Sequence, residues 1–206
     1  MATPWTTSIR QRGQLSVYVT PSSTRGLWGP VIRHVVQDFN SLSRRYRLGV
    51  RLIPSTRRAT QRDGADVCID TAFTSIAFTY DGSPTSESFD GRVMHGRTFL
   101  VSRDGKVEKA FVFLPSQPQI NTPQGLRTAG TYIMEVIAVH ELVHACGLGN
   151  EDHSTDDLFQ GNPQVDPGDT AGGDRVRVQV GGTMSWMPPL VLSGATTDRI
   201  RGLWAR

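Results

Sequence analysis

Hydrophobic and polar positions alternate along five short segments of the chain, a pattern typical of β-strands that bury one face. The five predicted strands span residues 15–20, 49–54, 65–72, 96–102 and 109–114. Turn-rich stretches separate them, including Asp81-Gly82-Ser83-Pro84 and Asp104-Gly105. A further short alternating run covers residues 175–180. These patterns predict strands along much of the chain.

Other segments carry apolar residues at helical spacing. The first begins near Pro30, because proline suits the first turn of a helix, and its apolar face carries Val31, Val35, Phe39 and Leu42. A last helix is expected near residues 197–204. The chain therefore predicts one strand, a long helix, four strands and then the helix described next.

The central helix carries candidate metal ligands on its apolar stripe. Four residues fall at i, i+4, i+7 and i+11, namely Ile133, Ile137, His140 and His144. Both imidazoles therefore continue the face that the isoleucines would bury. Thr122-Pro123 is a candidate start signal, and the first helical residue stays open by a few positions. Gly147 predicts the end of the helix, because glycine readily takes the left-handed conformation that reverses the chain.

The run His140-Glu141-Leu142-Val143-His144 has the spacing of a zinc hydrolase centre. Two histidines four residues apart project from the same helix face, so both can bind one metal ion, and the intervening glutamate can take a proton from the activated water. Catalytic zinc usually keeps three protein ligands. The following loop offers His153 as the favoured third ligand, with Asp152 as the alternative and Glu151 third.

Length and charge restrict the function without deciding it. At 206 residues we expect a single domain, 1–206, with a flexible N-terminus over residues 1–13. The net charge of +3 comes from scattered arginines with no recognition helix, so we expect no nucleic-acid binding. No export signal is present and no segment reaches the roughly 18 apolar residues that cross a bilayer. We therefore expect no membrane association, a cytoplasmic or leaderlessly exported protein, and a monomer.

Two smaller features receive structural interpretations. The two cysteines, Cys68 and Cys146, are interpreted as buried thiols in preference to a disulfide. Three aspartates of a glycine-rich segment could bind a structural calcium ion, namely Asp166, Asp169 and Asp174. Their spacing matches no calcium-binding loop, so a surface loop is favoured.

The motif resembles that of the metzincin metallopeptidases, and within them the matrixin-like branch. The residues that carry the resemblance are His140-Glu141-Leu142-Val143-His144-Ala145-Cys146-Gly147-Leu148-Gly149, followed by His153. In that family the third histidine follows the glycine by three residues, whereas His153 follows Gly147 by six. The resemblance implies an α+β fold. Its parts are a twisted five-stranded mixed sheet, two long helices, an irregular C-terminal part with a methionine turn, and a last helix.

The resemblance also implies further site residues. Met184 is favoured as the methionine of the turn, with Met187 as its competitor. The segment Pro188, Pro189 and Leu190 would form a wall of the pocket for the side chain after the cleaved bond. An extended substrate would lie along the strand predicted at residues 96–102, adding main-chain hydrogen bonds as another strand would.

The function expected from these observations is that of a zinc-dependent endopeptidase. Zinc bound by His140, His144 and His153 would activate a water molecule, and Glu141 would act as the general base. Two alternatives stay open. One is a zinc-stabilised binding or structural protein in which the extra residues before His153 have impaired catalysis. The other is a zinc amidase that acts on a cell-wall amide or another non-protein amide.

Overall fold

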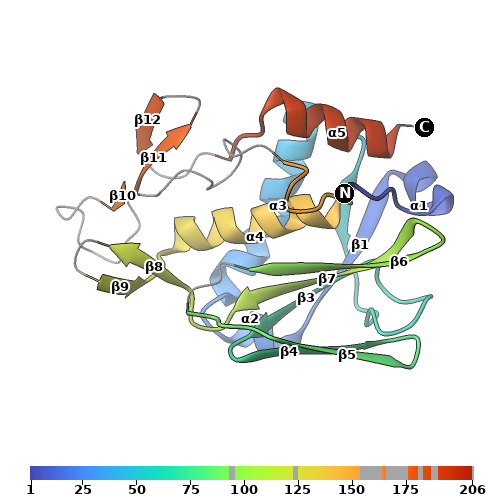
Figure 1. Cartoon of the computed structure of the whole chain (residues 1–206), viewed down its shortest axis with the longest axis horizontal. Helices are drawn as coiled ribbons and strands as arrows, with labels where there is room; N and C mark the ends of the chain where they lie inside the picture. The colour runs from blue at the N-terminus through green and yellow to red at the C-terminus, as the bar shows by residue number, and fades with distance from the viewer. Residues whose placement is uncertain are drawn as a thin grey trace.

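The computed structural model describes residues 1–92, 96–122, 125–153 and 190–205, together with the short strands at 164–165, 176–180 and 183–186. Within these residues the chain forms an α+β fold with a five-stranded mixed sheet and five helices (Figure 1). This confirms the general fold class expected from the sequence.

The main sheet has the strand order β2-β1-β3-β7-β6. Its strands are β1 (Gln14–Val19), β2 (Arg51–Pro54), β3 (Val67–Ala72), β6 (Arg97–Arg103) and β7 (Lys106–Pro115). Strands β2, β1, β3 and β7 are parallel, whereas β6 pairs antiparallel with β7. All five correspond to predicted strands, with ends shifted by three residues at most. Strand β6 therefore lies at one edge of the sheet.

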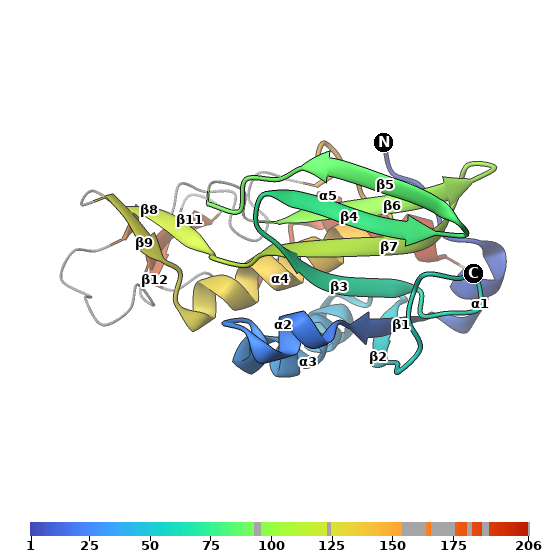
Figure 2. The same ribbon diagram turned by 90° about the horizontal axis from the view of Figure 1, so that it is seen from below.

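Helices cover one face of this sheet (Figures 1 and 2). The five helices are α1 (Thr7–Arg12), α2 (Pro21–Arg25), α3 (Gly29–Tyr46), α4 (Thr131–Ala145) and α5 (Gly194–Trp204). The predicted apolar face of α3 is buried, and Pro30 lies in its first turn. Buried side chains of α3, α4 and the sheet form the main hydrophobic core. This core holds α4, with its two histidines, against the sheet.

A β-hairpin covers the other face of the sheet, where the sequence predicted only a turn-rich stretch. Strands β4 (Ser75–Tyr80) and β5 (Ser83–Ser88) pair antiparallel around Asp81 and Gly82, which both have positive φ angles, 49° and 80°. Such a two-residue turn suits the twist of a hairpin. Phe78 stacks on Phe111 of β7 with ring centroids 4.2 Å apart. Aromatic packing on the sheet therefore makes the hairpin part of the fold.

The start of α4 differs from the prediction at Thr122-Pro123. A second hairpin, β8 (Gln119–Thr122) and β9 (Gly125–Thr128), precedes the helix, which begins only at Thr131. Gly125 has a φ of 102°, a conformation that no right-handed helix contains. Gly130 has extended backbone and forms the N-cap. The apolar stripe was assigned correctly, and the start signal was wrong.

The expectation of a flexible N-terminus over residues 1–13 also differs from the structure. The segment contains α1, and the side chain of Trp5 is fully buried. Its indole Nε1 donates a hydrogen bond to the carbonyl oxygen of Ala145, 2.9 Å away, at the end of α4. Trp5 also packs against Trp204 of α5, with ring centroids 6.5 Å apart. Burial of these two indoles fixes the segment beside the C-terminal end of α4.

The remaining expectations fall partly outside the described residues. Both cysteines are free, as expected, and Cys146 is buried, whereas Cys68 is only half-buried. The run at 175–180 corresponds to β11 (Val176–Val180), which pairs with β10 (Gln164–Val165) and β12 (Thr183–Trp186). The calcium candidates Asp166, Asp169 and Asp174 lie outside the described residues. Among the helices that the structure describes, none has both the length and the apolarity needed to span a membrane.

Candidate metal centre

Helix α4 presents His140 and His144 side by side. Nearly every residue from Ile133 onward is buried, because the helix packs against β6 and β7 of the sheet and against α3. His144 is buried and His140 is half-buried. Their Nε2 atoms lie only 3.0 Å apart, which the four-residue spacing on one helix face allows. Two imidazole nitrogens therefore point at the same small volume.

A tight turn after α4 returns the chain toward these histidines. Gly147 has a φ of 109°, and its backbone N–H donates to the carbonyl oxygen of His144 over 2.9 Å. A Cβ at this position would lie 2.3 Å from the carbonyl oxygen of Thr3, so glycine is required for space as well. The N–H of Gly149 then donates to the Asp152 carboxylate over 2.8 Å. This turn carries the chain to His153.

His153 completes a triangle with the two helix histidines. The three ring centroids lie 4.8, 4.9 and 4.7 Å apart. One nitrogen from each ring can be chosen so that all three lie within 4.8 Å of one another. His153 is only 8% exposed, so the ring faces the other two and not solvent. The longer loop before His153 therefore does not prevent it from joining the cluster.

The two carboxylates proposed as alternative third ligands have other partners. The Asp152 carboxylate accepts the hydrogen bond from Gly149 and lies 3.3 Å from the Met1 ammonium group. The Glu151 side chain is largely exposed and also contacts that ammonium group. Within the described residues, the group of side chains close enough to hold a metal ion consists of the three histidines.

The surroundings of His144 favour the neutral form of its ring, with the proton on Nδ1. Its Nδ1 lies 3.0 Å from the carbonyl oxygen of Leu148, which can only accept, so Nδ1 carries the proton and Nε2 offers its lone pair. Burial lowers the pKa of His144 to about 4, against the opposing effect of the Leu148 hydrogen bond. The ring is therefore neutral near pH 7, which is the form that binds metals.

Glu141 follows His140 on α4 and is buried, with 5% of the residue exposed. Its Oε2 accepts a hydrogen bond of 2.6 Å from the hydroxyl of Thr98 on β6. Burial raises the pKa of Glu141 to about 7, while the Thr98 hydrogen bond and the charge of Arg97 lower it. A carboxyl group with this pKa can both accept and release a proton near neutral pH.

The donor set suits a divalent transition-metal ion. Three imidazole nitrogens are ligands of intermediate softness, which zinc, copper, iron and nickel accept and which calcium and magnesium do not favour. The three histidines of this chain lie close enough together to bind one such ion. The structure therefore brings together the three histidines that the sequence singled out, and Glu141 follows His140 directly on α4.

The residues assigned through the resemblance are placed only in part. The backbone of Met184 lies in β12, opposite Gln179 of β11, and its side chain lies outside the described residues. Met187, Pro188 and Pro189 lie entirely outside the described residues. Leu190 is partly buried and packs against the main core.

Two neighbours of Glu141 were not found from the sequence, namely Thr98 and Gly96. A Cβ on Gly96 would lie 2.6 Å from Cγ of Glu141, so the strand backbone comes very close to this side chain. Glycine before a strand and threonine within it are common, and neither has a local pattern that points to a residue about 43 positions later. Only the pairing of β6 with β7 beside α4 brings them there.

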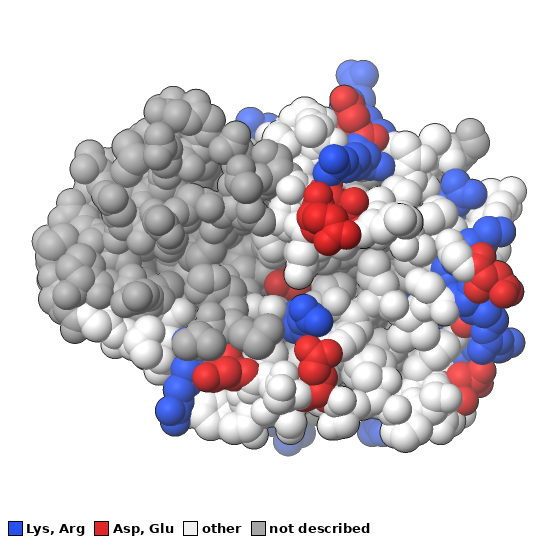
Figure 3. All heavy atoms as spheres, viewed as in Figure 1, with Lys and Arg blue, Asp and Glu red and all other residues white. Residues whose placement is uncertain are grey.

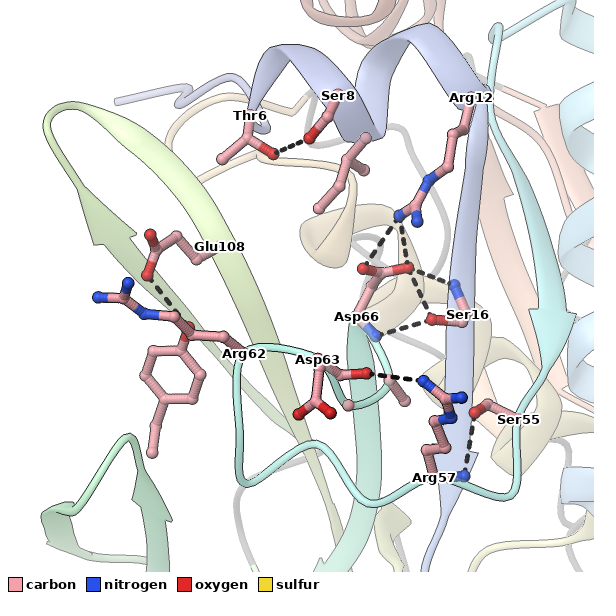
Figure 4. A pocket seen from close by; sticks show the side chains of 14 residues that line it. Thr6, Ser8, Arg12, Ser16, Ser55, Arg57, Arg62, Asp63, Asp66 and Glu108 are labelled. Atoms are coloured by element: carbon pink, nitrogen blue, oxygen red, sulfur yellow. Dashed lines mark hydrogen bonds and ion pairs between the residues drawn. The ribbon is translucent and has the colours of Figure 1, made fainter.

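A cavity of about 460 Å³ lies away from the histidine cluster and is lined by other residues (Figure 4). Its charged lining residues are Arg12, Arg57, Arg62, Asp63, Asp66 and Glu108. Arg12 donates to both carboxylate oxygens of Asp66, each 3.2 Å away, and the Ser16 hydroxyl donates to the same group. The charged lining therefore consists of three cationic and three anionic side chains. On the face shown in Figure 3, acidic and basic side chains are likewise interspersed.

No protein-family model matches the chain, and no curated protein matches it. A functional assignment must therefore rest on the fold and on the chemistry of the histidine cluster.

Proposed function

We propose that this chain is a zinc-dependent endopeptidase of the metzincin type. One observation carries the proposal: the ligand atoms of three imidazoles lie within 4.8 Å of one another, and the residue after His140 on the same helix is the buried Glu141. Three protein ligands that leave a fourth position for water are typical of catalytic zinc, whereas structural zinc sites use four. The donor set therefore favours zinc and a hydrolytic role.

The arrangement of the fold supports the same proposal. The edge strand β6 runs beside α4, since Thr98 of β6 contacts Glu141 of α4. An edge strand has unpaired main-chain groups, and an extended peptide can pair with them as an additional strand. The scissile bond of such a peptide would lie near the histidines. This is the substrate position that the resemblance to metzincins implied.

The chain's own residues have distinct tasks in the proposed reaction. His140, His144 and His153 would hold the metal ion. When bound, zinc supplies Lewis-acid activation of a water molecule and stabilises negative charge on the substrate carbonyl oxygen. Glu141 accepts a proton from the water as it attacks the carbonyl carbon, and then donates that proton to the leaving amine.

The test is cleavage of a broad peptide library by the zinc-loaded protein, with the products identified by mass spectrometry. We expect internal peptide bonds to be cleaved, a chelator to stop cleavage, and added zinc to restore it. Glu141→Ala should bind zinc at the same stoichiometry and cleave nothing. Glu135→Ala, which removes another glutamate of α4, is the matched control and should remain active.

Three outcomes would contradict the proposal. Full activity of Glu141→Ala would remove the assigned base. One bound zinc ion without cleavage of any peptide would support a zinc-stabilised binding or structural protein. Cleavage confined to non-protein amides would support the amidase alternative.

A further inference from the structure

The segment that begins edge strand β6 contacts Glu141 through two alternate residues. Gly96 and Thr98 lie on the side of the strand that faces α4, because both approach the Glu141 side chain. Phe99 lies on the opposite side, where its ring packs against Phe78 and Phe113. The alternation of a β-strand therefore places two small residues, two positions apart, against one carboxyl group.

The hydroxyl group of Thr98 is the hydrogen-bond donor to this carboxyl group. Its Oγ1 lies 2.6 Å from Oε2 of Glu141 and 3.1 Å from the main-chain oxygen of the same residue. The main-chain oxygen can only accept a hydrogen bond, and the ionised carboxylate can also only accept. The hydroxyl of Thr98 is therefore the donor. Threonine is also stiff about its first side-chain torsion, so its hydroxyl is held in place by the strand.

Gly96 provides the space that the carboxyl group occupies. A Cβ built on Gly96 would lie 2.6 Å from Cγ, 2.6 Å from Oε1 and 2.7 Å from Cδ of Glu141. Such distances are shorter than the contacts that carbon atoms make in proteins. Gly96 has no left-handed backbone angle, so the reason for glycine here is space alone. Any larger residue would require Glu141 to move.

We propose that Thr98 and Gly96 are positioning residues for Glu141. Thr98 fixes one carboxylate oxygen by its hydrogen bond, and Gly96 leaves room for the rest of the group. The inference rests on the proposed function, in which Glu141 is the general base. It adds that one strand performs two tasks: β6 offers its edge to the substrate and also holds the base. The register of the substrate and the position of the base are then set by the same backbone.

The expected effect is on turnover and not on binding. A glutamate side chain has three rotatable bonds, and a displacement of about 1 Å in a reacting group can cost on the order of 100-fold in rate. Removing a hydrogen bond to a charged group should lower kcat by about 10- to 100-fold. Zinc content should stay unchanged, because Thr98 is not among the metal ligands, and KM should stay unchanged, because the substrate would pair with the main chain of β6 while the Thr98 side chain faces α4.

The experiment compares zinc-loaded variants that differ by single groups. Thr98→Val removes the hydroxyl at nearly constant volume, Thr98→Ser restores it, and Thr79→Val makes the same change at an exposed position of β4. We expect kcat to fall only in Thr98→Val, with serine restoring most of it. Gly96→Ala should also lower kcat, whereas Gly202→Ala, where a Cβ meets nothing within 4 Å, should not. Wild-type kcat in Thr98→Val, or equal losses in the valine and serine variants, would overturn the proposal.

A second measurement needs no activity and separates this inference from the proposed function. In the metal-free protein, Thr98→Val should lower the thermal midpoint by about 3–6 °C, and it should lower it far less when Glu141→Ala is already present. Additive shifts would show that the contact does not hold Glu141 and would overturn the inference. Non-additive shifts in a protein that cleaves no substrate would contradict the endopeptidase proposal and leave the contact established.

Discussion

Replacing His153 with alanine removes one imidazole of the cluster and leaves the helix pair His140 and His144 intact. We expect this change to lower zinc affinity strongly, because the His153 ring is 8% exposed and its centroid lies 4.9 and 4.7 Å from the other two. No carboxylate of the described loop can replace it without leaving its present partners.

The magnitude follows from the number of ligands. Zinc bound by four ligands in small domains contributes about 10–16 kcal/mol, or roughly 2.5–4 kcal/mol for each ligand. Losing one of three protein ligands should therefore weaken zinc binding by about 10²- to 10³-fold. A second water can occupy the vacated position, which places the expected value toward the lower end.

The assay is competition for zinc against a chromophoric chelator at fixed pH. Asp152→Asn is the control, because the amide keeps the size of the side chain and an oxygen that can accept from the Gly149 N–H. We expect its zinc affinity to stay within about threefold of the wild type. A large loss in Asp152→Asn together with wild-type affinity in His153→Ala would refute the assignment of the third ligand.

Two further predictions concern the fold around the site. Trp5→Ala should lower the free energy of unfolding by about 3–5 kcal/mol, because Trp5 is fully buried and its indole donates a hydrogen bond to the carbonyl oxygen of Ala145. Urea denaturation measures this free energy, and a loss below about 1 kcal/mol would contradict the prediction. Burial lowers the pKa of Lys109 below 10.5 in the folded state, so the unfolded state binds more protons between the lowered pKa and 10.5, and stability should rise with pH through that window. Lys109→Met should reduce the rise of the free energy of unfolding with pH, as measured by urea denaturation at a series of pH values. An unchanged rise would show that other groups cause it.

Local patterns in the sequence were sufficient for the framework of the fold. The five strands and the buried face of α3 were predicted because one buried face imposes a period on neighbouring residues of the same segment. The pair His140 and His144 belongs to the same class of information, since a helix fixes the relation between positions four apart. Gly147 marked the end of α4 for a comparable local reason.

Contacts between distant segments were decided only by the tertiary structure. The approach of His153 to the two helix histidines depended on the turn after α4, in which the Gly149 N–H donates to the Asp152 carboxylate. The ordered structure of segment 1–13 depended on the burial of Trp5 against the end of α4. The hairpin of β4 and β5 required an aromatic surface on the sheet, which its own residues do not reveal.

The difference between what the sequence predicted and what only the structure decided has one physical reason. Periodicity is a property of consecutive residues, so the sequence by itself determined which segments are strands or helices and which two histidines share a helix face. The neighbours of Glu141 are separated from it by 43 residues or more, and their approach depends on the pairing of β6 with β7 and on the packing of α4 against both. The path of the folded chain therefore decided that His153 lies beside the two helix histidines, and it decided the surroundings of the Glu141 carboxyl group.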